Sequence, residues 1–131
     1  MVITRQGAIG NKLFAIAENF AKFLDDFEVI FRLHPNEDSE QYSSNRKNLI
    51  ISHKDPKFLD LIASADYLVG GFSTTLFEGA ALGCKVIAVD VPGIENLKSS
   101  IESGEFYLLK DRDKDSILDA IGLAKTVNAE R

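Results

Sequence analysis

Two spacings of hydrophobic residues alternate along the 131-residue chain. Short runs rich in β-branched and aromatic residues predict strands, and apolar residues at every third or fourth position predict helices. The predicted strands are residues 2–4, 27–33, 49–51, 67–69, 85–89 and 106–109. The predicted helices are residues 11–25, a helix that starts at Asp55-Pro56, a helix that starts near Ser73 and ends at Gly83, a short helix at 96–103 and a last helix at 114–126.

The regular alternation of strands and helices predicts the fold class. It is typical of a parallel sheet with right-handed crossover connections. We therefore predict an α/β fold: a doubly wound, Rossmann-like parallel sheet of about six strands with helices on both faces. Residues 1–131 form a single domain in this interpretation. Ligands of such sheets bind outside the carboxyl ends of the strands, near the switch point between the first and fourth strands.

Composition and charge narrow the function mainly by exclusion. Fifteen basic and 20 acidic residues give a net charge of −5, which argues against a general nucleic-acid binder. The single Cys84 excludes an internal disulfide, and two histidines without nearby acids at ligand spacing predict no metal site. We predict no resident cofactor. The chain shows neither a signal peptide nor a membrane span, so we expect a cytoplasmic protein.

The segment 65–83 is the most informative part of the sequence, because it predicts a strand, a glycine turn and a helix in succession. Gly70-Gly71 ends the strand, and Ser73, Thr74 and Thr75 supply hydroxyl groups that can cap the helix that follows. Unbonded N–H groups and a partial positive charge at a helix N-terminus favour an anion such as phosphate. Helix caps and glycine turns are also common without any ligand, so the residues alone leave both interpretations open.

Glu78 favours the functional interpretation of this segment. It lies one turn further along a helix whose other residues are mostly apolar, where a carboxylate needs a partner or an open cleft. A carboxylate one turn behind a phosphate site is well placed to hold a ribose diol.

Further candidates follow the other predicted strands. Arg32 and His34 end the second strand; His34 can donate to a phosphate oxygen or act as a general acid for a leaving phosphate. Arg32 points to the same face and is equally compatible with a surface ion pair. The loop after the first strand, with Gln6, Gly7 and Gly10, opens the first helix and is a second anion-site candidate, although it lacks the full dinucleotide fingerprint.

Residues after the fifth predicted strand reach the same edge of the sheet. Asp90, Glu95 and Asn96 lie there, and Glu95 or Asn96 can bond a sugar hydroxyl, although acids in loops are usually only solvated.

The order of these motifs resembles a known family. Arg32-Leu33-His34-Pro35, the segment 65–83 and the run Lys-Val-Ile-Ala-Val at 85–89 are similar to the C-terminal, donor-binding half of GT-B glycosyltransferases of the capsular and surface polysaccharide type. The resemblance covers nearly the whole chain. Bacterial sialyltransferases and glycerophosphate polymerases carry a similar His-Pro and Ser/Thr pair at the phosphate of a CMP- or CDP-linked donor. The resemblance thus implies phosphate contacts at His34, Ser73, Thr74 and Thr75, and a ribose contact at Glu78.

The resemblance also implies what the chain lacks. A full enzyme of this architecture has a second, N-terminal half that supplies the acceptor site, so the chain is expected to be half of a two-domain transferase that binds a nucleotide-sugar donor but is inactive alone. The full-length enzyme would associate peripherally with a membrane. Two alternatives stay open: a nucleotide-sugar 2-epimerase half-domain of the same fold, and a non-catalytic nucleotide-binding, phosphate-binding or interaction module.

Overall fold

A computed structural model describes residues 2–4, 10–33, 42–53, 57–71, 73–90, 94–111 and 113–123, with the backbone alone for residues 4, 10, 11, 73, 74 and 123. Its elements are β1 (Val2–Thr4), α1 (Gly10–Phe23), β2 (Val29–Arg32), β3 (Leu49–Ser52), α2 (Phe58–Ala63), β4 (Tyr67–Gly70), α3 (Ser73–Ala81), β5 (Lys85–Val89), the 3₁₀ helix η3 (Ile94–Leu97), α4 (Lys98–Glu102), β6 (Tyr107–Leu109) and α5 (Lys114–Leu123).

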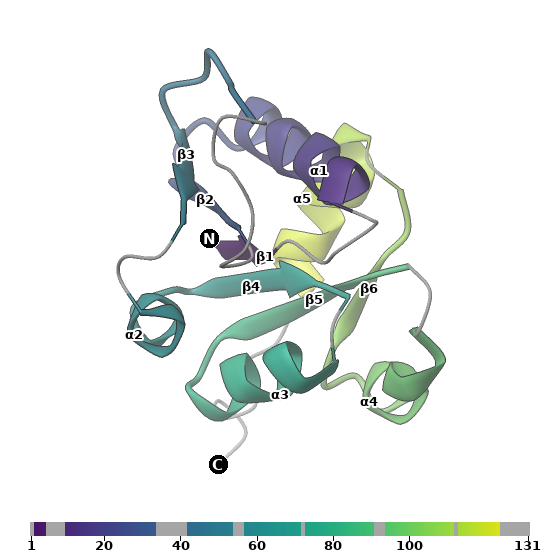
Figure 1. The fold of residues 1–131 in the computed structure, drawn as a ribbon. Coiled ribbons are helices and arrows are strands. Elements are labelled where there is room, and N and C mark those ends of the chain that lie inside the picture. Colours follow the sequence, from purple (N-terminus) through teal and green to yellow (C-terminus); the bar gives the residue numbers. More distant parts are fainter. Residues whose placement is uncertain are drawn as a thin grey trace.

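The six strands form one sheet in the order β3-β2-β1-β4-β5-β6, and every neighbouring pair is parallel. The strand order reverses between β1 and β4, as predicted. Helices α1 and α5 lie on one face of the sheet, and α2, α3 and α4 lie on the other (Figure 1). The prediction of a doubly wound α/β fold is therefore confirmed.

Each face of the sheet has its own hydrophobic core. On the first face, Leu13, Ile16 and Phe20 of α1 pack with Phe31 of β2 and Ile117 of α5. The second core is formed by side chains from α2, α3, β4 and β5: Leu61, Ile62, Leu68, Leu76, Ala80 and Val86. The inner strands β4 and β5 are buried on both sides, which is why their sequences are nearly continuous apolar runs.

Cys84 is a core residue, as expected for a lone cysteine. Its side chain is fully buried, and its thiol donates to the carbonyl oxygens of Ile62 and Ala65 at 3.1 and 3.4 Å. Burial raises the pKa of the Cys84 thiol, because the thiolate loses its hydration there.

The structure corrects the prediction for the second helix. Helix α2 begins at Phe58 rather than at Asp55-Pro56, which lie outside the described residues. Its N-cap residue is Lys57, whose side chain makes no capping bond. Leu59 is apolar but 52% exposed. A helix of six residues can cover the sheet only with one narrow side, and here Leu61 and Ile62 form that side.

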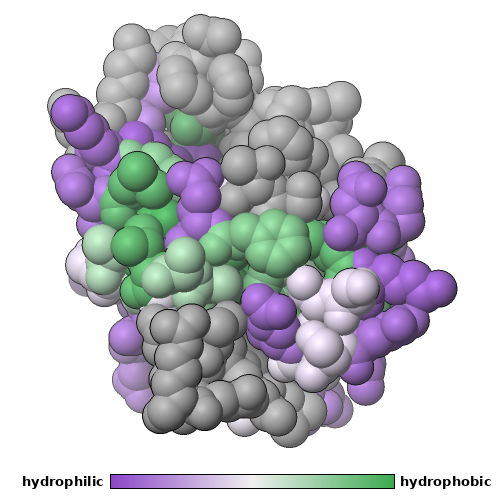
Figure 2. Space-filling view, turned by 90° about the horizontal axis from the view of Figure 1, so that it is seen from below, coloured by the Kyte–Doolittle hydropathy of each residue, from purple (hydrophilic) through white to green (hydrophobic). Residues whose placement is uncertain are grey.

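The apolar residues of α3 are not all buried, although the sequence predicted a largely apolar environment for this helix. Leu76 and Ala80 face the sheet and are buried, whereas Phe77 and Leu82 are 44% and 45% exposed. Hydrophobic side chains accordingly gather on the outer face of the molecule over α2 and α3 (Figure 2). On the other face of the sheet, Leu118 of α5 is also exposed.

Gly83 ends α3 as predicted. It has a φ of 94°, a conformation that glycine adopts without the steric cost of a β-carbon. The Gly83 amide donates to the Ala80 carbonyl at 3.0 Å, and the Cys84 amide donates to the Gly79 carbonyl at 2.9 Å. These bonds satisfy the last carbonyls of the helix.

Two helical glycines provide a matched test of packing. A methyl group on Gly79 would overlap the Cδ2 atom of Leu68, which is fully buried, whereas no atom of the described residues lies within 4 Å of a methyl on Gly122. We predict that Gly79→Ala lowers the free energy of unfolding by about 1–3 kcal/mol despite its better helix propensity. Gly122→Ala should raise that free energy by about 0.5–1 kcal/mol. Urea unfolding of both variants measures this, and a stabilised Gly79→Ala protein would show that the α3–β4 contact is looser than described.

Candidate functional site

Two helices begin at the carboxyl edge of the sheet, directly after the two strands that flank the switch point. Helix α1 follows β1, and α3 follows β4 after Gly71 and Phe72. The helices lie on opposite faces of the sheet, so their N-termini flank the position where the strand order reverses (Figure 1). Neither helix has an acidic residue in its first turn, so no side chain there neutralises the partial positive charge.

The first turn of α3 contains the three predicted hydroxyl residues. The helix begins at Ser73, so Ser73, Thr74 and Thr75 lie within its first turn. The capping hypothesis placed them before the helix. The side chain of Thr75 is partly buried.

Gly10 is the first residue of α1, at the same edge. Gln6, Gly7 and the predicted acid His34 lie outside the described residues. Their proposed phosphate contacts therefore stay predictions.

Arg32 ends β2 and is held inside the protein. It is 9% exposed, and its Nη1 group donates to the Ser52 hydroxyl at 3.2 Å. The parallel register places Arg32 between Thr4 of β1 and Ser52 of β3. The guanidinium group is thus fixed by neighbouring strands close to the carboxyl edge, and a guanidinium group presents a planar fork of donors that suits phosphate and carboxylate oxygens.

Glu78 is exposed in the second turn of α3. The sequence predicted that this carboxylate needs a partner or an open cleft because its helix is mostly apolar. Glu78 lies on the solvent side next to the exposed Phe77, so the apolar residues of the helix do not bury its carboxylate. Contact with a ribose stays a prediction, and solvent exposure leaves the carboxylate accessible to a ligand.

A hollow of about 520 Å³ lies at the carboxyl edge between α1 and the ends of β5 and β6. We call it the carboxyl-edge pocket. It is lined by Lys12, Ala15, Ile16, Val89, Asp90, Leu109, Lys110 and Asp111. The Lys12 ammonium group donates to the Asp90 carbonyl oxygen at 2.7 Å and so connects the first turn of α1 to the end of β5.

Sequence reasoning missed most of this pocket. Asp90 was considered, but Lys12, Lys110 and Asp111 were not. Lys110 and Asp111 follow the sixth strand directly, so the rule that selected residues after the second and fourth strands would also have selected them. Lys12 belongs to the polar side of α1 and carries no separate signal in the sequence.

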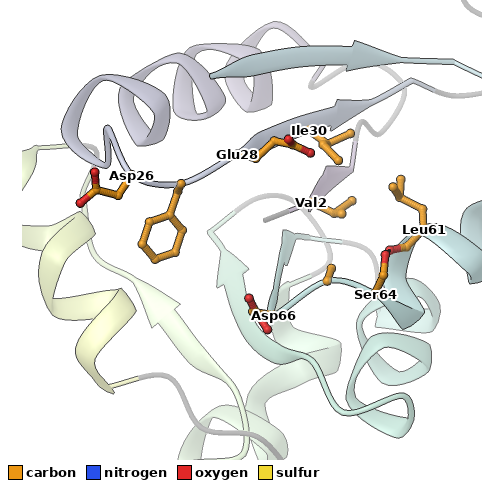
Figure 3. A pocket seen from close by; sticks show the side chains of 9 residues that line it. Val2, Asp26, Glu28, Ile30, Leu61, Ser64 and Asp66 are labelled. Atoms are coloured by element: carbon orange, nitrogen blue, oxygen red, sulfur yellow. The ribbon is translucent and has the colours of Figure 1, made fainter. Parts of the chain in front are cut away.

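A second hollow, of about 400 Å³, lies at the opposite, amino edge of the sheet. Its lining includes the carboxylates of Asp26, Glu28 and Asp66 and the apolar side chains of Val2, Ile30 and Leu61 (Figure 3). None of the nine residues that line it is basic. Three carboxylates repel a phosphate group, so this hollow does not suit a nucleotide.

The described residues contain no group of three or more metal-ligating side chains. Within the same part of the chain, no helix has both the length and the apolar character required to cross a membrane.

Comparison with solved structures gives the fold a precedent. The chain resembles a spinosyn rhamnosyltransferase, SpnG, solved in complex with thymidine diphosphate, with a TM-score of 0.67 and 16% sequence identity. The match covers 92% of this chain and 35% of that protein, so the chain spans about a third of its length. No family model and no curated protein sequence matches the chain. The chain therefore shares a Rossmann-like α/β fold with part of that rhamnosyltransferase.

Proposed function

We propose that this chain is the nucleotide-sugar-binding domain of a glycosyltransferase that builds capsular or other cell-surface polysaccharide in the cytoplasm. The observation that carries the proposal is the structural match: nearly all of the chain superposes on about a third of a rhamnosyltransferase solved with a nucleoside diphosphate. The share of that protein outside the match leaves room for a second domain, which would supply the acceptor site.

The carboxyl edge has the chemistry that a diphosphate needs. The N-terminus of α3 favours an anion by about 0.3–1 kcal/mol through its partial charge alone. Ser73, Thr74 and Thr75 in its first turn can add hydroxyl donors. The whole chain carries a net charge of −5, which repels a diphosphate. Local donors such as these therefore have to provide the attraction.

The other predicted residues have distinct roles in this proposal. His34 donates a proton to the phosphate that leaves during transfer, while Arg32 and the loop with Gln6, Gly7 and Gly10 hold the phosphate oxygens. Glu78 accepts hydrogen bonds from the ribose hydroxyl groups. A second domain carries the group that activates the acceptor, so residues 1–131 by themselves bind the donor without turning it over.

Calorimetric titration of the chain with TDP, UDP, CDP, CMP and inorganic phosphate tests the proposal. We expect at least one nucleotide to bind with a Kd below about 1 mM. Thr75→Val should weaken nucleotide and phosphate alike, and Glu78→Gln should weaken the nucleotide about tenfold without changing phosphate binding, because only the nucleotide has a ribose.

Asp119→Asn is the matched control for Glu78→Gln. It removes the same charge from an exposed residue of α5, on the other face of the sheet. Failure of all four nucleotides to bind at millimolar concentration would refute the donor-site proposal. Equal losses in Glu78→Gln and Asp119→Asn would refute the ribose contact and leave the phosphate site standing.

A further inference from the structure

The carboxyl-edge pocket combines charged groups at its rim with an apolar floor. Ile16, Val89 and Leu109 contribute hydrophobic side chains, and all three are buried in the core. The rim consists of exposed lysine and aspartate residues from three different elements. A hollow with this lining suits a ligand that has both an apolar surface and several polar groups.

The two lysines give the rim its capacity for an anion. The Lys12 ammonium group has three N–H donors, and one of them is directed to the Asp90 carbonyl oxygen. That bond holds the ammonium group at the pocket and leaves its other donors available. The Lys110 side chain forms no hydrogen bond or ion pair with the part of the chain that the structure describes.

The carboxylates and the floor restrict the ligand further. Asp90 is exposed beside Lys12, and its carboxylate can accept hydrogen bonds from hydroxyl groups. An apolar floor can pack against the C–H face of a sugar ring. The pocket also lies at the edge of the sheet where ligands of this fold bind, beside the N-terminus of α1.

We propose that the carboxyl-edge pocket binds a sugar ring that carries a carboxylate or phosphate group. Lys12 and Lys110 bind the anionic group, Asp90 accepts the ring hydroxyls, and Ile16, Val89 and Leu109 contact the ring. This inference rests on the proposed function, since it names the class of sugar that the transferase handles. It is independent of the α3 residues that would hold the nucleotide.

The test is a titration of the ¹⁵N-labelled chain with four probes: glucuronate, glucose 1-phosphate, glucose and inorganic phosphate. We expect glucuronate or glucose 1-phosphate to shift the amide signals of Lys12, Asp90 and Lys110 and to bind at least about fivefold more tightly than glucose and phosphate. The ratio between the two charged sugars then tells whether the anion is a carboxylate or a phosphate. If glucose or phosphate alone binds as tightly as both charged sugars, the proposal is overturned.

Lys110→Gln is the decisive variant, because Lys110 is exposed and its replacement leaves the core packing unchanged. It should weaken the charged sugar about five- to tenfold and leave glucose unchanged. Lys47→Gln is the control: it makes the same change at an exposed residue just before β3, at the amino edge. An equal loss in both variants would mean that net charge alone attracts the sugar, and the proposed pocket would be refuted.

Nucleotide titration of the same proteins separates this inference from the proposed function. Nucleotide binding without charged-sugar binding refutes the pocket and supports the donor site. If no nucleotide binds but a charged sugar does, and Lys110→Gln weakens that sugar, the result supports the pocket and refutes the donor site.

Discussion

Phe31→Ala should lower the free energy of unfolding by about 3–5 kcal/mol. Phe31 is fully buried in β2, and its ring contacts those of Phe14 and Tyr42 at centroid distances of 5.1 and 5.3 Å. Phe14 and Tyr42 also contact each other at 5.0 Å, so the three rings form a closed cluster. Removing the central ring leaves a cavity and breaks two aromatic contacts at once, a large share of the 5–15 kcal/mol that typically separates folded from unfolded protein.

Phe77→Ala is the matched control for this prediction. Phe77 is 44% exposed, and within the described part of the chain its ring contacts that of Phe106, at 5.1 Å. Its removal should cost less than about half as much as the loss of Phe31, because less apolar surface returns to water. Urea unfolding followed by circular dichroism measures both variants. Similar losses would show that the Phe31 cluster is not the tightly packed part of the core.

The fold could be predicted from the sequence because the inner strands are buried on both faces. Segments such as 85–89 are then almost entirely apolar, and the long helices repeat their apolar residues with a helical period. Once the elements alternate, the handedness of the crossovers leaves few arrangements. The strand order and the switch point between β1 and β4 follow from this reasoning.

The details that sequence missed are those that depend on which side of a short helix meets the sheet. Leu59 and Leu118 are apolar and lie at plausible helical positions, yet both are exposed, because Leu61 and Ile62 in α2 and Ile117 and Ala120 in α5 already cover the sheet. Hydrophobic period alone does not decide between adjacent apolar residues. The same ambiguity applies to Glu78. Its helix is mostly apolar in sequence, yet Glu78 and its apolar neighbour Phe77 both lie on the exposed side.

The candidate site was accessible from sequence only where residues follow strands directly. This rule found Arg32, which the structure places at the end of β2, and the first turn of α3. It did not find the carboxyl-edge pocket, because that hollow forms where Lys12 contacts Asp90, a residue 78 positions away in the chain. Contacts of this kind are set by helix packing, which a single sequence does not encode in any local pattern.

Asn48→Asp should lower the free energy of unfolding by about 2–3 kcal/mol at neutral pH. The Asn48 amide group donates to three backbone carbonyl oxygens, those of Ala21, Leu24 and Phe27, at 2.9, 3.2 and 3.1 Å. These carbonyls belong to the end of α1 and the turn that leads into β2, and Asn48 itself immediately precedes β3. One amide thus joins the helix end to the sheet, and a carboxylate in its place repels all three oxygens.

The loss in Asn48→Asp should depend on pH in a way that a general loss of packing would not. Only the protonated form of the introduced carboxyl can donate to the carbonyl oxygens, so folding raises its pKa above the usual value of about 3.9. The protonated form therefore stabilises the variant fully below that value, and this stabilisation disappears as the pH rises through the higher folded-state pKa. Unfolding measured against wild type at pH 4 and pH 7.5 should show the smaller difference at pH 4. The control Asn96→Asp, at an exposed position in η3, should differ little from wild type at either pH. If Asn48→Asp loses the same free energy of unfolding at both pH values, donation by Asn48 does not hold the end of α1.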